Sequence, residues 1–203
     1  MRILINERQY NLLTEDTNGL DLFLDMLEST FPEVSNFKEL LKTFIEGSNC
    51  QNIEFRPIHM GAFGLALHDK VVISPNVLRF PLNSVLYIIL HEIAHQYQYK
   101  KYGKEKMYEL YTGELQIDDA VKFLRHTESV ADQFSIRKCR ELAKLGLINL
   151  EGLIKSGNYA NVDDMSFKTL LVKLRNSIRG KHMGNPDKVS ELLYNSIVNG
   201  MTI

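Results

Sequence analysis

One ten-residue stretch, IILHEIAHQY at positions 88–97, decides how the rest of the sequence is interpreted. Glu92 is its only residue that is charged at neutral pH with histidine counted as neutral, and this pattern indicates a helix buried in a core. His91 and His95 are four residues apart, so on a helix they are offset by one turn and only about 40°. We therefore expect the two imidazoles to converge on one point.

A histidine pair of this kind is typical of a zinc site. Neutral imidazole is a good zinc ligand, and two imidazoles from one helix fix half of a tetrahedral site. Glu92 points about 100° further round the helix, where it can reach a zinc-bound water as a general base without ligating the metal. The alternative is two surface histidines on an amphipathic helix. That alternative leaves Glu92 unexplained, because an unpaired carboxylate in so apolar a run is energetically costly.

A third ligand is expected downstream, within RHTESVAD at positions 125–132. Glu128 and Asp132 are four apart and share a helix face, so one carboxylate can bind zinc while the other accepts the N–H of a ligating imidazole. The alternative is a solvated helix face. His126 is a rival third ligand, since sites with three histidines exist, or it stabilises the oxyanion as a catalytic residue. It lies two residues from Glu128, so both cannot face the metal from a regular helix.

The motif His-Glu-x-x-His followed by Glu-x-x-x-Asp resembles the gluzincin branch of the zincin metallopeptidases, over about residues 62–140. The small size looks more like the minimal and SprT-like gluzincins, although the zinc ribbon that SprT-like proteins often append has no counterpart here. The resemblance implies that His91, His95 and Glu128 ligate zinc, that Glu92 is the base, and that Asp132 is hydrogen-bonded to His91.

The same resemblance implies a substrate-binding strand. In zincins an edge strand above the active-site helix pairs with extended substrate backbone, a form of β-augmentation. Here that role would fall to Phe63, Gly64, Leu65 and Ala66. The alternative for this run is an internal strand of a hairpin.

The remaining pattern predicts an α+β, zincin-like fold that is mostly helical, with a small mixed sheet before the active-site helix. One domain over residues 1–203 is expected, with a helical N-terminal segment (1–48), a catalytic core (51–145) and a helical C-terminal segment (146–203). A strand is predicted near 2–6 and a short helical turn near 7–13. Helices are predicted near 19–30, 36–46, 82–102, 118–145, 163–178 and 187–198, and strands within 51–58, 62–67 and 70–74. Gly103 is predicted to end the helix at 82–102, and His68-Asp69 is predicted to form a hairpin turn between the last two strands.

Composition limits the partners and the compartment. The chain has 203 residues, of which 44% are hydrophobic and 24% charged, and a net charge of −1, so no global basic field attracts nucleic acid. The basic residues of segment 168–181 predict a solvated helix face, and nucleic-acid contact is the minority alternative. Only two cysteines occur, which favours reduced thiols and a cytoplasmic protein. The longest uncharged apolar run, Pro81–Leu90, is half of the roughly 20 residues that span a bilayer, so no membrane partner is expected.

These observations predict a zinc-dependent hydrolase, specifically a metallopeptidase that cleaves a peptide or protein substrate. Zinc-activated water would attack the carbonyl while Glu92 takes its proton. Two alternatives stay open: a zinc amidase acting on a non-protein substrate, and a non-catalytic zincin-fold binding or assembly protein. The second alternative would need the metal ligands but not the base.

Overall fold

The computed structural model describes residues 19–48, 50, 52–59, 62–151, 164–178 and 185–198. The described residues form mostly helices together with a small three-stranded mixed sheet, as expected for an α+β fold. The α-helices are α2 (Gly19–Thr30), α3 (Lys38–Glu46), α4 (Leu82–Tyr102), α5 (Lys104–Thr112), α6 (Ile117–Lys144), α7 (Asp164–Ile178) and α8 (Pro186–Ile197). The strands are β1 (Ile53–Phe55), β2 (Gly64–Ala66) and β3 (Val71–Ile73). The predictions for residues 2–13 lie outside the described residues.

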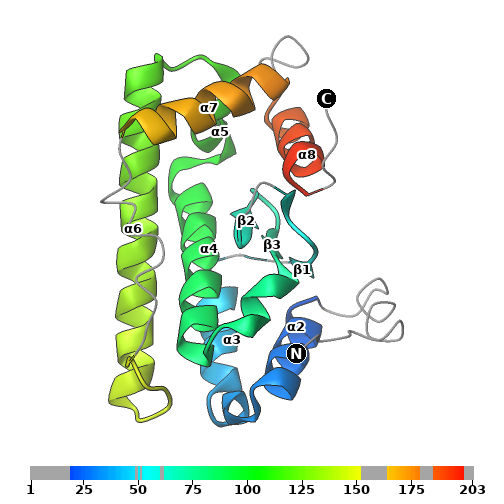
Figure 1. Cartoon of the computed structure of the whole chain (residues 1–203), viewed down its shortest axis with the longest axis vertical. Coiled ribbons are helices and arrows are strands. Elements are labelled where there is room, and N and C mark those ends of the chain that lie inside the picture. The colour runs from blue at the N-terminus through cyan, green and yellow to red at the C-terminus, as the bar shows by residue number, and fades with distance from the viewer. Residues whose placement is uncertain are drawn as a thin grey trace.

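Helix α4 runs through the middle of the molecule, between α6 and the sheet (Figure 1). Val85, Leu86, Ile89 and Leu90 are all fully buried in it. A helix that is apolar nearly all round must be covered on several sides, and this explains its central position. It ends where the sequence predicts, at Gly103, whose positive φ of 82° is a conformation that glycine adopts readily.

The sheet has the strand order β1-β3-β2, with β1 parallel and β2 antiparallel to β3. The predicted hairpin turn at His68-Asp69 is confirmed, since Leu67 N–H donates to the Lys70 carbonyl at 2.8 Å. The buried amide of Gln96 ties this turn to α4, because its Nε2 donates to the Leu67 and Lys70 carbonyls at 2.5 and 3.2 Å. Strand β2, at an edge of this sheet, is thereby fixed beside α4.

Helices α2 and α3 close one end of the core against the sheet. Phe23 of α2 stacks on Phe55 of β1 with ring centroids 5.3 Å apart. The helix predicted to begin at Asn36 instead begins at Lys38, because residues Pro32–Asn36 form a 3-10 turn. The N-terminal cap is Phe37, which makes no side-chain capping bond.

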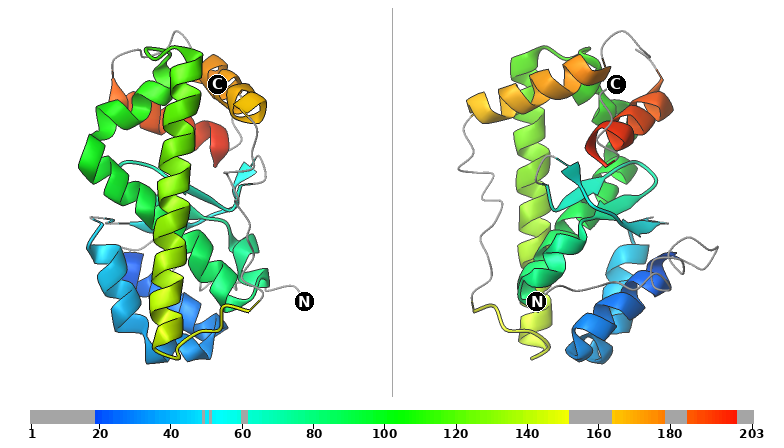
Figure 2. Two further views of the ribbon diagram at one scale, coloured as in Figure 1. Left: turned by 90° about the vertical axis from the view of Figure 1, so that its left-hand side faces the viewer. Right: turned by 45° about the vertical axis from the view of Figure 1, so that its right-hand side comes forward.

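Helices α5, α7 and α8 gather at the other end of the molecule (Figures 1 and 2). The pattern did not predict α5, although Met107, Tyr108 and Leu110 are buried in it and Gly113 stops it with a φ of 87°. Helices α7 and α8 lie within a residue or so of their predicted bounds. None of the helices in this described part of the chain is both long and apolar enough to cross a membrane.

The basic segment predicted near 168–181 is largely engaged in contacts where the structure describes it. Lys168 pairs with Asp118 at 3.0 Å, and Arg175 Nε donates to the Leu110 carbonyl at 2.8 Å. Arg179 and Lys181 lie outside the described residues. These contacts attach α7 to α6 and α5.

Candidate metal centre

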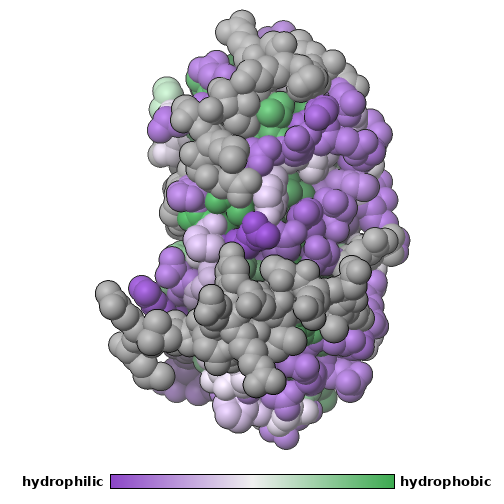
Figure 3. Space-filling view, turned by 90° about the vertical axis from the view of Figure 1, so that its right-hand side faces the viewer, coloured by the Kyte–Doolittle hydropathy of each residue, from purple (hydrophilic) through white to green (hydrophobic). Residues whose placement is uncertain are grey.

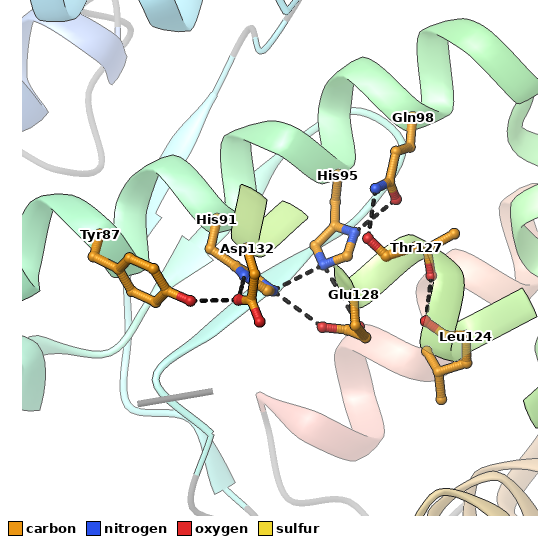
Figure 4. A network of polar contacts seen from close by, with 8 residues as sticks. All are labelled: Tyr87, His91, His95, Gln98, Leu124, Thr127, Glu128 and Asp132. Carbon is orange, nitrogen blue, oxygen red and sulfur yellow. Dashed lines mark hydrogen bonds and ion pairs between the residues drawn. The ribbon is translucent and has the colours of Figure 1, made fainter. Parts of the chain in front are cut away.

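His91 and His95 of α4 and Glu128 of α6 meet at one point (Figure 4). The two Nε2 atoms are 3.2 Å apart. Glu128 Oε2 lies 3.1 Å from His91 Nε2, and its Oε1 lies 3.6 Å from His95 Nε2. The three side chains are buried or nearly so, and their ligand atoms all lie within 4.8 Å of one another. They form a group that could hold a metal ion.

Asp132 orients His91 from the far side of its ring. Its Oδ1 lies 3.0 Å from His91 Nδ1 and also accepts a hydrogen bond from the Tyr87 hydroxyl. A carboxylate of this kind only accepts hydrogen bonds, so Nδ1 of His91 carries a proton and Nε2 is left to face the site. The structure thus places Asp132 beside His91, where the family resemblance puts it.

Gln98 orients His95 in the same way, and the sequence analysis missed it. Its Nε2 donates to the Thr127 carbonyl at 2.7 Å, which fixes the amide so that Oε1 faces His95 Nδ1 at 2.9 Å. Gln98 is only 3% exposed. The available signal was its spacing, because a residue three positions after His95 lies on the same helix face. Thr127 directly precedes Glu128, so this bond also joins α4 to the backbone of α6 beside the third ligand.

The donor set fits a metal ion. With both protons held on Nδ1, the two Nε2 lone pairs and the Glu128 carboxylate face one another at 3.1 to 3.6 Å. Electron-rich atoms at such distances repel unless they share a cation. Without a metal, a proton on His91 can supply the positive charge. Burial lowers the pKa of His91, but its hydrogen bonds to Asp132 and Glu128 outweigh this effect and raise the pKa to about 10. A metal ion would replace that proton.

Glu92 stands apart from the three converging groups and lies against β2. The Ala66 backbone N–H donates to its carboxylate, and burial raises the pKa of Glu92. Strand β2 approaches so closely that a Cβ atom at Gly64 would lie 2.4 Å from Glu92 Oε1. Glycine at position 64 is therefore needed to leave room for the carboxylate.

A cavity of about 330 Å³ opens beside these residues. Gly64, Leu65 and Ala66 line it together with His91, His95, Glu92 and Glu128. Phe63, predicted to share the role of its neighbours, is not among the lining residues and packs edge-to-face on Phe80 at 5.2 Å.

The structure does not bring His126 to the site. It is exposed and does not line the cavity, because it is two residues, or about 200°, from Glu128 on the same helix. Two tyrosines do reach the cavity, Tyr99 and Tyr111. Tyr108 does not, since its side chain is buried and its hydroxyl accepts from His68 N–H at 3.1 Å.

Comparison with known proteins gives no relative: no family model, no curated protein and no solved structure matches this chain. A functional assignment therefore depends on the geometry of the site and on the chemistry of its side chains.

Replacing Gln98 by leucine is expected to lower metal affinity about 10- to 100-fold, because His95 loses the partner that fixes its tautomer and ring orientation. Competition against a chromophoric chelator measures the change. Gln133→Leu is the matched control, since Gln133 is an exposed glutamine of α6. Equal affinity in Gln98→Leu and the wild type, with both folded by circular dichroism, would show that Gln98 does not position His95.

Proposed function

We propose that this chain is a zinc-dependent metallopeptidase with a zincin-like fold, in which His91, His95 and Glu128 hold the zinc ion. One observation carries the proposal. The three potential ligands converge beside a separate, half-buried carboxylate, Glu92, and all four line one cavity with the edge strand β2.

The distances within the group are close to those of a zinc site. In a tetrahedral site with bonds of 2.0–2.1 Å, ligand atoms lie about 3.3 Å from one another. His91 Nε2 lies 3.2 Å from His95 Nε2 and 3.1 Å from Glu128 Oε2, and the other Glu128 oxygen, Oε1, lies 3.6 Å from His95 Nε2. Three protein ligands leave a fourth position open, as in catalytic rather than structural zinc sites.

Glu92 has the properties of a general base. Zinc bound here would polarise the substrate carbonyl and lower the pKa of a water ligand toward ~7. Burial raises the pKa of Glu92, which lets this carboxylate accept a proton and then pass it to the leaving amine. Its hydrogen bond from Ala66 N–H holds it at the cavity wall. A non-catalytic scaffold would need the metal ligands but offers no role for Glu92.

Strand β2 is suited to binding an extended peptide. Phe63 and Leu67 direct backbone groups toward β3, since Phe63 O accepts from Ser74 N–H and Leu67 N–H donates to Lys70 O. Backbone groups alternate in direction along a strand, so Gly64 and Ala66 direct theirs away from β3. The Ala66 N–H donates to Glu92, so the substrate backbone would pair with the Gly64 groups and the Ala66 carbonyl. This arrangement supports β-augmentation by the substrate along residues 64–66.

Tyr111 is the side chain best suited to stabilise the oxyanion. It lines the cavity with Glu92 and Glu128. Burial raises the pKa of its phenol, and the charges of Glu128 and Glu92 raise it further. The hydroxyl therefore stays protonated at neutral pH and can donate a hydrogen bond to negative charge that develops on the carbonyl oxygen.

Elemental mass spectrometry is expected to find one zinc ion per chain in the wild type and little in Glu128→Ala. Asp119→Ala, which removes an exposed carboxylate of the same helix, should keep the zinc. Glu92→Gln should also keep the zinc but lose the cleavage of an unfolded protein such as casein.

Three results would contradict the proposal. Zinc retained by Glu128→Ala would remove Glu128 as a ligand, and iron in place of zinc would change the class of reaction. Full activity in zinc-loaded Glu92→Gln would remove the base and leave the non-catalytic alternative.

Gly64→Ala is expected to lower kcat/KM about 10- to 100-fold, because the new methyl group displaces the Glu92 carboxylate and misplacement by about 1 Å is enough for such a loss. Zinc content and melting temperature should change little, since the ligands are on other elements. Activity at the wild-type level would mean that Glu92 does not act from the position it has here.

Tyr111→Phe is expected to reduce kcat about 100- to 1,000-fold with unchanged zinc content, as for loss of one oxyanion donor. Tyr102→Phe, which alters a tyrosine outside the cavity lining, is the control. A change confined to KM would assign Tyr111 to substrate binding instead.

A further inference from the structure

The cavity has two chemically different halves. One half holds the metal centre, Glu92 and strand β2. The other half is a wall built by α5, α7 and α8, none of which carries a potential metal ligand. This apolar wall consists of Met107, Leu110, Leu170, Leu171, Leu174 and Ile197.

The apolar wall offers almost nothing to a polar ligand. Among the described residues that line the cavity, the carboxylates are Glu92 and Glu128, and both belong to the metal centre. The other polar side chains of the lining are Tyr99, Tyr111, Thr127 and the two histidines of the metal centre. Sugars and nucleotides carry many groups that must be hydrogen-bonded once water is removed, so such a wall disfavours them. An apolar side chain gives up no hydrogen bonds to water when it enters the cavity.

Polar contacts between α5, α7, α8 and the sheet hold the apolar wall in place. Arg175 Nε donates to the Leu110 carbonyl at 2.8 Å, which joins α7 to α5. The Tyr194 hydroxyl donates to Glu54 at 2.7 Å, which joins α8 to the sheet, and Lys104 pairs with Asp187 at 2.8 Å. The wall therefore exists before a ligand binds, as is usual for small-molecule pockets.

The exposed fraction of the α7 side chains that line the cavity differs, so some lie deep and one lies at the rim. Leu171 is fully buried and Leu174 is 5% exposed, whereas Leu170 is 39% exposed. The cavity volume of about 330 Å³ lies at the low end of ligand pockets. This size suits one large side chain with its adjoining backbone, not a folded protein surface.

We propose that the apolar wall is a specificity subsite, which receives a large aliphatic or aromatic side chain next to the scissile bond of an extended peptide. The inference rests on the proposed peptidase function and names its substrate class. Strand β2 would hold the peptide backbone, and the wall would select the side chain. Leu170, at the rim, would contact that side chain first.

Binding tests the subsite without requiring catalysis. The probes are fluorescein-labelled pentapeptides of glycine with leucine, phenylalanine or aspartate at the centre, titrated into full-length, zinc-loaded Glu92→Gln protein. The leucine and phenylalanine peptides should bind at least about tenfold more tightly than the aspartate peptide, as expected for desolvating a charge against an apolar wall.

Two variants in the same background locate the effect. Leu170→Lys places a charge at the rim and should abolish the preference for apolar peptides. Val172→Lys is the matched control, because Val172 is 43% exposed on the same helix but does not line the cavity, and it should leave the preference unchanged. Equal binding of all three peptides, or equal effects of the two lysines, would overturn the subsite.

Cleavage-site mapping separates this inference from the function on which it rests. A digest of unfolded casein by the wild type, read by mass spectrometry, should show large apolar residues enriched at one position beside the cleaved bond. Cleavage without that enrichment would overturn the subsite and leave the peptidase. Apolar-selective binding without any cleavage would overturn the peptidase and leave an apolar binding site.

Discussion

The packing of α4 against α6 is the constraint on which the rest of the site depends. Two imidazoles from one helix supply half of a metal site, and the third ligand must come from a second helix held at a fixed distance and rotation. Ala131, fully buried on α6, keeps the side chain between the helices small. The bond from Gln98 to the Thr127 carbonyl then fixes the rotation one residue before Glu128.

The polar groups around this contact form two short chains that begin at the two histidines. One runs from His91 through Asp132 to Tyr87, and the other from His95 through Gln98 to the α6 backbone. The Asp132 carboxylate can only accept, and the Thr127 carbonyl fixes the orientation of the Gln98 amide, so each neutral imidazole has one defined tautomer. The consequence is a cluster of lone pairs at the wall of the cavity that a cation would hold together. Such preorganisation is what a metal site requires, because the ligands do not have to be reoriented when the ion binds.

The rest of the fold places strand β2 and the side chains of three further helices around these residues. Gln96 attaches the hairpin to α4, so β2 passes directly over Glu92, and Gly64 allows the close approach. Helices α5, α7 and α8 then enclose the opposite side of the cavity with aliphatic side chains. The candidate metal centre, the edge strand β2 and the apolar side chains of α5, α7 and α8 thus come from different parts of the chain and share one cavity.

The sequence by itself determined what short-range geometry controls. The helical period of residues 82–102 placed His91 and His95 on one face, Gly103 marked the helix end, and the two runs around His68-Asp69 specified a hairpin. These features depend on spacings of a few residues, which local backbone geometry fixes. The weakly amphipathic α5 carried too faint a signal to be predicted.

Only the tertiary structure decided which distant side chains meet. It brought Glu128 to the histidine pair and left His126 exposed, although both lie on the same predicted helix. It turned Gln98 toward His95 and brought α7 and α8 to the cavity. It also left Phe63 out of the cavity lining, although the next residue, Gly64, is part of it. The physical reason is that the rotation of one helix against another is set by packing over the whole interface. No single residue spacing encodes that rotation.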